Sequence, residues 1–369
     1  MGHVLHIPIY MNGSMLLLAA LVTIVYGNWV RSQLELPNPV SYLVGLGFVA
    51  CLLGSVLLHE LGHALTARRY QIGVRGITLE LLGGWTEMDR DAPTPKVDAL
   101  VSLAGPAVSL VLGGLATAAT LALPDRTLAD QVAFQLAASN LLVAVFNVLP
   151  GLPLDGGRAL RAALWAMIRD RNRATEAAAW SGRILAFACM VIAIWLYRVQ
   201  FVSLFGLAFV LLVVFTLWQG AGQSIRLARM TRRFPLVDLA RLARPLLTVP
   251  AGTPLGEAQR RRSEDPRPNV VLAVTDSAGN LTALVDPVAA ERVPVDRRPW
   301  VAVDTVSRSR DAVPALALGL SGEQVVRALQ AHPAGQYVIT SGANGEDVVG
   351  VLRVGDVAEI LEPRRPRRP

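Results

Sequence analysis

The stretch Leu57-Leu58-His59-Glu60-Leu61-Gly62-His63-Ala64 lies near the end of a long apolar run and decides how the chain is interpreted. Residues i and i+4 share one face of a helix, so His59 and His63 can direct two imidazoles at one metal ion. Glu60 follows the first of them and can act as a general base beside the metal. The pattern predicts a metal-dependent hydrolase.

An H-E-x-x-H pattern also arises by chance on solvated helix faces. Here the two histidines and the glutamate lie inside an apolar run. Ionisable groups in such a position are costly and usually functional. The metal interpretation is therefore favoured over the chance one.

A third metal ligand is expected, because catalytic zinc is held by three protein ligands and a water molecule. Asp155 is the candidate, within the run Phe-Asn-Val-Leu-Pro-Gly-Leu-Pro-Leu-Asp-Gly-Gly at 146–157. The prolines and glycines of this run break a helix, so the carboxylate can turn inward. The same aspartate could instead cap the following helix. Taken alone the two readings are equal, and the need for a third ligand favours Asp155 as a ligand.

Six apolar segments are long enough to cross a bilayer, which takes about 17–25 residues each. They lie near 14–30, 42–66, 98–122, 130–149, 180–197 and 201–218. With a cytoplasmic N-terminus, the inner loops carry fourteen Arg or Lys residues and the outer loops three. Because basic residues concentrate in cytoplasmic loops, we expect both termini in the cytoplasm. The expected location of this multi-pass protein is a bacterial plasma membrane.

Charge and cysteine content exclude other classes of protein. The net charge of +7 is concentrated in loops bordering the membrane, so we expect no nucleic-acid partner. Cys51 and Cys189 are the only cysteines, and both lie in apolar runs. We therefore expect neither a disulfide framework nor a metal site built from thiolates.

Three motifs together resemble the site-2 protease family of intramembrane zinc metalloproteases over roughly residues 1–220. They are His-Glu-Leu-Gly-His at 59–63, Ala-Gly-Pro at 104–106, and Asn-x-x-Pro-x-x-Pro-Leu-Asp-Gly-Gly at 147–157. The resemblance implies that one catalytic Zn²⁺ is bound by His59, His63 and Asp155. It also implies that Glu60 is the base and that Asn147 contacts the substrate or the developing oxyanion.

The implied activity is hydrolysis of peptide bonds in membrane-spanning substrates, as in regulated intramembrane proteolysis. Bacterial relatives often cut membrane-tethered anti-sigma factors or signal-peptide remnants, so single-span membrane proteins within the lipid bilayer are the expected partners. One departure from the family is Ser109, four residues after Gly105, where several relatives carry Asn. It leaves the packing role of this position open and does not affect the chemistry.

Residues 71–88 predict short strands, because apolar residues alternate at Ile77, Leu79 and Leu81. Gly83 and Gly84 allow close backbone approach or a sharp turn. A transmembrane substrate must unwind before it is cut, and an edge strand here could hold it by strand addition. The alternative is an amphipathic hairpin on the membrane surface; the family resemblance favours substrate binding at Gly83 and Gly84.

Residues 236–362 contain a weak internal repeat in which each copy has a lead-in, a helix, a hairpin and a closing helix. The repeat resembles a tandem CBS pair, a module that often binds adenine nucleotides. Asp356 is the ribose contact that the resemblance implies. The usual Ser or Thr is Arg353, however, and the first copy has Ala283 and Ala289 where Gly and Asp are expected. A packing or homodimerisation module is therefore an equal alternative.

The expected fold is an all-α membrane bundle of six transmembrane helices with a small membrane-associated β-hairpin, followed by a soluble α/β CBS pair. The expected domains are a protease domain at 1–222, a linker at 223–235, the CBS pair at 236–362 and a basic disordered tail at 363–369. The alternative function is a CBS-regulated metal or ion transporter. Transport favours polar residues spread over several spans, whereas here they concentrate at 59–63 and 147–155. A catalytically inactive relative is disfavoured by the intact Glu60.

Overall fold

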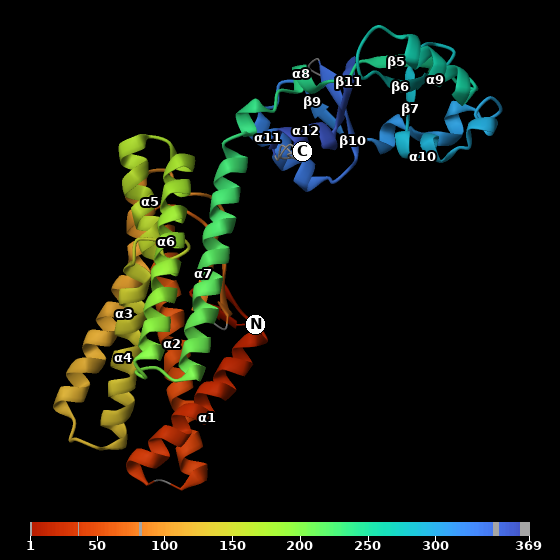
Figure 1. The fold of residues 1–369 in the computed structure, drawn as a ribbon. Helices are drawn as coiled ribbons and strands as arrows, with labels where there is room; N and C mark the ends of the chain where they lie inside the picture. Colours follow the sequence, from red (N-terminus) through yellow and green to blue (C-terminus); the bar gives the residue numbers. More distant parts are fainter. Residues whose placement is uncertain (1, 36, 81–82, 342–346, 362–369) are drawn as a thin grey trace. The chain divides into compact units, whose positions relative to one another are not determined.

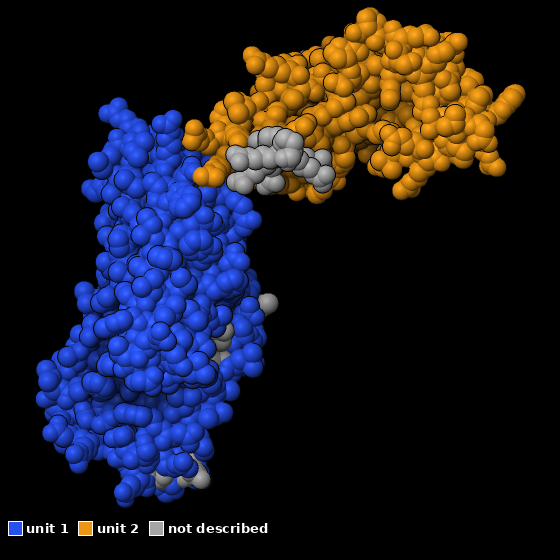
Figure 2. Space-filling model, viewed as in Figure 1, with its two compact units in different colours: residues 1–228 blue, residues 229–369 orange. Residues whose placement is uncertain are grey.

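The computed structural model describes residues 2–35, 37–80, 83–341 and 347–361. The basic tail expected at 363–369 lies outside these residues. The chain divides into two compact units, Met1–Ala228 and Arg229–Pro369, coloured separately in Figure 2. Each unit has its own buried apolar clusters, so each is described by itself.

Six long apolar helices form the body of the first unit, as predicted, and they run side by side in Figure 1. They are α1 (Ser14–Leu34), α2 (Asn38–Arg69), α3 (Pro95–Ala122), α4 (Leu128–Val148), α6 (Arg171–Arg198) and α7 (Leu204–Thr231). Large apolar side chains such as Leu17, Leu121 and Phe187 are exposed on their outer faces. Helices that are apolar all round suit a lipid environment, so the unit is a multi-pass membrane domain.

A seventh helix of this unit, α5 (Asp155–Ile168), is too short to be a candidate span; a helix after Asp155 was considered only as something this residue could cap. It has one apolar face, as a helix does when it packs against neighbours on one side only. Asp155 is its first residue, so the backbone break that precedes α5 determines where this carboxylate lies.

The break between α4 and α5 packs directly on α6. The Leu152 N–H donates to the Ala178 carbonyl, and a Cβ added to Gly182 would lie only 1.9 Å from the Leu152 oxygen. A Cβ on Gly157 would lie 2.1 Å from the carbonyl carbon of Gly151. Glycine is therefore required where these backbones touch, and the contact holds the start of α5 in place.

The predicted strands at 71–88 are confirmed, but they belong to a larger sheet than a hairpin. Its strands are β1 (Gly2–Val4), β2 (Ile7–Met11), β3 (Val74–Glu80) and β4 (Gly83–Met88), in the order β1-β2-β3-β4. The strand β2 pairs with β3 in parallel, and β3 with β4 in antiparallel fashion. Ile7, Ile77 and Leu79 pack with Leu61 of α2, so the sheet lies against the helix that carries the histidines. The strand β4 is an edge strand.

The second unit has the expected α/β repeat. The first copy contains β5 (Leu246–Pro250), α9 (Leu255–Glu264), β6 (Val271–Thr275), β7 (Leu281–Val285) and α10 (Pro287–Arg292), and β8 (Ser307–Ser309) follows it. The second contains β9 (Ala315–Ala317), α11 (Gly322–Ala331), β10 (Gln336–Ser341), β11 (Asp347–Arg353) and α12 (Val354–Leu361). A short helix, α8 (Leu239–Leu242), precedes both copies.

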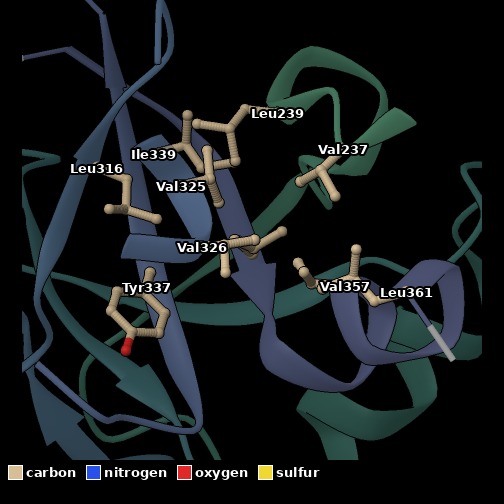
Figure 3. Packing of buried hydrophobic residues seen from close by; sticks show 10 residues of the cluster. Val237, Leu239, Leu316, Val325, Val326, Tyr337, Ile339, Val357 and Leu361 are labelled. Carbon is tan, nitrogen blue, oxygen red and sulfur yellow. The ribbon is translucent and has the colours of Figure 1, made fainter. Parts of the chain in front are cut away.

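Each copy contributes one sheet to this unit. The two orders are β5-β6-β7-β8 and β11-β10-β9, and in both the lead-in strand pairs in parallel with the first strand of a hairpin. Figure 3 shows the core of the second copy, where Val325 and Val326 of α11 pack with Tyr337, Ile339 and Val357. Burial of apolar side chains of this kind is the main favourable contribution to folding of the unit.

Candidate metal centre

The structure brings the three predicted ligands together at one point. The Nε2 atoms of His59 and His63 are 3.3 Å apart, and each lies 3.2 Å from Oδ2 of Asp155. Both histidines are at least 95% buried, and the ligand atoms of all three residues lie within 4.8 Å of one another. Two ligands come from one turn of α2 and the third from the first turn of α5.

The other ring nitrogen of each histidine is held by α3. His63 Nδ1 lies 2.7 Å from the carbonyl oxygen of Val101, which can only accept a hydrogen bond, so Nδ1 donates its proton. Nε2 of His63 then keeps its lone pair for a metal. His59 Nδ1 lies 2.8 Å from Oγ of Ser109, which can accept in the same way. Such outer partners fix the orientation and tautomer of metal-binding histidines.

The donor set fits a catalytic zinc ion. Two imidazole nitrogens and one carboxylate oxygen leave a fourth position open, which is the arrangement of zinc hydrolases. The site also requires a residue without a side chain where α3 faces the two histidines. A Cβ added to Gly105 of α3 would lie 2.3 Å from His63 Nε2 and 2.6 Å from His59 Nε2. The second residue of the Ala-Gly-Pro motif therefore leaves the space in which the nitrogens converge.

Glu60 lies beside the two histidines and is 95% buried. Its Oε2 accepts a hydrogen bond of 2.7 Å from the Thr86 hydroxyl of β4. Gly84 of the same strand approaches equally closely, since a Cβ added there would lie 2.8 Å from Glu60 Cγ. The edge strand thus fixes the carboxylate of the candidate base, and among the described residues its other oxygen has no hydrogen-bond donor and can take a proton.

Two further predicted residues, Asn147 and Gly83, belong to α4 and β4. Asn147 is partly buried in the last turn of α4, and within the described part of the chain its amide has no hydrogen-bond partner. Gly83 begins β4 with φ of +143°, a conformation that favours glycine, and a Cβ added there would have no described atom within 4 Å beyond its chain neighbours. A substrate segment beside β4 therefore meets little steric hindrance at Gly83.

Three contacts of the site were not predicted from the sequence. Thr86 lies in a predicted strand, but no sequence pattern distinguishes it from the other residues of that strand. Ser109 was noticed only as a departure from the family, yet it hydrogen-bonds His59. Val101 acts through its backbone carbonyl, which no side-chain pattern reveals. The helical spacing of Val101, Gly105 and Ser109 (i, i+4, i+8) places them on one face of α3 and was the only available clue.

In the second unit, Asp356 is already engaged. The Arg244 guanidinium donates to both carboxylate oxygens of Asp356, at 2.7 and 2.6 Å, and this pairing raises the pKa of Arg244. A ribose hydroxyl would have to compete with this bidentate ion pair. Arg353 also stands where a small hydroxyl side chain is expected. The residues present therefore fit poorly with an adenine nucleotide held by Asp356.

Comparison with known proteins gives a consistent set of similarities. The model of Peptidase family M50 matches residues 47–139 and 125–192. Rip3, a candidate zinc metalloprotease of Mycobacterium tuberculosis, is 33% identical over 90% of this chain and 84% of its own. The candidate zinc metalloprotease sll0528 of Synechocystis sp. is 28% identical over 98% of this chain and 94% of its own. The solved site-2 protease of Methanocaldococcus jannaschii is 25% identical and covers 61% of this chain and 94% of that one, with a TM-score of 0.45.

Adding one methyl group at Gly105 tests the geometry of this centre. We expect Gly105→Ala to push the imidazoles apart and to weaken zinc binding by roughly 10- to 100-fold, the range seen when histidine positioning is lost. The measurement is zinc affinity by competition with a chelator. Gly114→Ala is the matched control on the same helix, because open space surrounds Gly114. Zinc affinity equal to wild type in Gly105→Ala would contradict the assigned geometry.

Proposed function

The chain belongs to peptidase family M50, and from this premise we propose which of its residues carry out peptide hydrolysis. It is a zinc metalloprotease of the site-2 protease type, and its six apolar helices make it an intramembrane enzyme. The observation that carries the proposal is the convergence of His59, His63 and Asp155 beside a buried Glu60. The matched family and the similar proteins are metallopeptidases, so the transport alternative is less well supported.

His59, His63 and Asp155 are the residues that would hold the zinc ion. When bound there, zinc would lower the pKa of a water molecule and polarise the substrate carbonyl. Val101 and Ser109 keep both Nε2 lone pairs directed at the site. The negative charge of Asp155 offsets part of the cost of placing a cation among buried groups.

Glu60 is the general base in this scheme. Its free oxygen takes a proton from the attacking water and later delivers that proton to the leaving amine. The hydrogen bond from Thr86 to the other oxygen keeps the carboxylate from rotating away. Asn147 is proposed to donate its amide N–H to the oxyanion that develops on the scissile carbonyl. No described residue hydrogen-bonds this side-chain amide, which supports the proposed contact.

The substrate is proposed to be a single-span membrane protein that unwinds and pairs with β4. A transmembrane helix satisfies its own backbone hydrogen bonds, so its peptide bonds are exposed only after local unwinding. The edge of β4 that pairs with no other described strand can supply replacement hydrogen bonds by strand addition. Gly83 gives backbone access there, while Gly84 leaves room for the side chain of Glu60. Anti-sigma factors and signal-peptide remnants are candidate substrates of this kind.

The topology that we propose places both termini in the cytoplasm of a bacterial plasma membrane, because basic residues concentrate in the loops on that side. The helix α2 extends ten residues beyond His59, to Arg69. At 1.5 Å per residue, the site then lies about 15 Å from the cytoplasmic end of this helix. Cleavage there would release the cytoplasmic portion of a substrate.

The second unit is proposed to be a regulatory CBS pair. The internal repeat and the pairing of strands within each copy support this assignment. Because Asp356 is paired with Arg244, we favour regulation through packing or homodimerisation over nucleotide binding at Asp356. The domain limits stay as proposed from the sequence, with a protease domain at 1–222 and the CBS pair at 236–362.

Two substitutions separate the base from the ligands. We expect Glu60→Gln to keep stoichiometric zinc and to lose peptide hydrolysis by roughly 10²- to 10⁴-fold, the usual contribution of a general base. His59→Ala should lose both zinc and activity. The measurements are zinc content and cleavage of a single-span protein in detergent or lipid vesicles. A proteolytically active Glu60→Gln enzyme would refute the role of Glu60.

The contribution of the edge strand to the base can be isolated at Thr86. Replacing the hydroxyl with a methyl group in Thr86→Val removes the hydrogen bond to Glu60 at nearly constant volume. Since a hydrogen bond to a charged group contributes about 1.5–3 kcal/mol, kcat/KM should fall roughly 10- to 100-fold while zinc content is unchanged. Thr86→Ser, which keeps the hydroxyl, is the control. Equal kcat/KM in Thr86→Val and wild type would show that Thr86 does not position the base.

A further inference from the structure

A buried ion pair joins α3 to α5 and has no part in the chemistry described so far. The Arg161 guanidinium donates from Nε to Asp98 Oδ2 at 3.0 Å and from Nη2 to Oδ1 at 2.6 Å. The side chains are only 1% exposed for Asp98 and 13% exposed for Arg161. The fork of the guanidinium and the plane of the carboxylate must align for these bonds to form, so the pair fixes a direction as well as a distance.

The position of the pair along the helices relates it to the metal centre. Asp98 lies seven residues before Gly105 on α3, and Arg161 lies six residues after Asp155 on α5. At 1.5 Å per residue these separations are about 10 and 9 Å. The ion pair therefore lies at one end of the interface between α3 and α5, and the ligand cluster lies at the other. Because the two separations along the helices are nearly equal, both sets of contacts can form at the same time.

The same face of α3 serves as a common reference for all three ligands. Val101 and Ser109 orient the two histidines, and Asp98 binds the helix that carries Asp155. Zinc–ligand bonds are about 2.0–2.2 Å long, and functional sites tolerate displacements of only about 0.5 Å. A small slide or rotation of α5 would therefore move Asp155 out of reach of the ion.

Contacts at the start of α5 do not remove the need for such a device. The close backbone contact of Gly157 with Gly151 holds one end of the helix. Apolar packing of Leu160 on Leu152 and Ala178 also restrains α5 but imposes no direction, whereas a hydrogen-bonded second point about 9 Å from Asp155 does. Arg161 supplies that second point.

We propose that the Asp98–Arg161 ion pair positions the third zinc ligand. It sets the orientation of α5 and so holds the Asp155 carboxylate close to the Nε2 atoms of His59 and His63. A buried ion pair is poor evidence of a contribution to stability, because desolvation offsets its attraction and apolar replacements are often as stable. Retention of the pair beside a metal centre is explained by the geometry that it imposes. The proposal rests on the assignment of His59, His63 and Asp155 as zinc ligands.

The test uses the full chain with both charges replaced by apolar groups, Asp98→Leu together with Arg161→Met. Since such a double replacement leaves no uncompensated charge, the metal-free protein should keep a thermal midpoint close to wild type. Zinc affinity, measured by chelator competition, should nevertheless fall roughly 10- to 100-fold, as with other outer residues that orient metal ligands. Arg158→Met, which removes a positive charge from α5 outside the pair, is the control and should keep wild-type affinity.

The outcomes separate this proposal from the one on which it rests. A wild-type protein that binds no zinc overturns the ligand assignment itself. A folded double variant with wild-type zinc affinity overturns only the positioning role. If the double variant does not fold, Arg161→Lys decides, because an ammonium group keeps the charge but cannot form the fork. Intermediate zinc affinity in Arg161→Lys supports positioning, and unchanged affinity contradicts it.

Discussion

The convergence of two imidazoles and one carboxylate on a single point is the constraint on which the rest of the membrane unit depends. His59 and His63 are placed by the helical repeat of α2, but Asp155 belongs to another helix and must be brought to them. Three features bring Asp155 to the histidines: the backbone break before α5, the glycine contacts with α6, and the space left by the missing side chain at Gly105. The helix α3 is the scaffold of the site, because it orients both histidines and contacts α5.

Hydrolysis inside a membrane sets a second requirement, since the substrate must give up its helical hydrogen bonds before it is cut. The sheet β1-β2-β3-β4 meets this requirement by offering the free edge of β4 next to the base. One strand thereby serves two purposes: Thr86 and Gly84 contact Glu60, and Gly83 leaves space for another backbone. The strand β4 therefore links the proposed binding of an unwound substrate to the activation of water.

The chemistry of the site could be predicted from the sequence because it depends on local spacing. The i, i+4 histidines, the helix-breaking run before Asp155 and the six apolar segments are all short-range signals. Strands β1 and β2 were missed because they are only three and five residues long and because β2 joins the sheet by pairing with the distant strand β3. The contacts of Thr86, Ser109 and the Val101 carbonyl were missed for a related reason. They are tertiary contacts between residues whose sequence neighbours give no signal. The extent of the short helix α5, which lies between two spans, was not predicted either.

X-ray absorption by the zinc-loaded protein tests the central claim most directly, because it reports the atoms bound to the ion. The account predicts two imidazole nitrogens at about 2.0–2.1 Å together with oxygen ligands at about 2.0–2.2 Å. Replacing Asp155 with Ala should change the oxygen contribution and leave both imidazoles in place. A zinc site with a single imidazole, or with sulfur at about 2.3 Å, would contradict the convergence of His59, His63 and Asp155 on one ion.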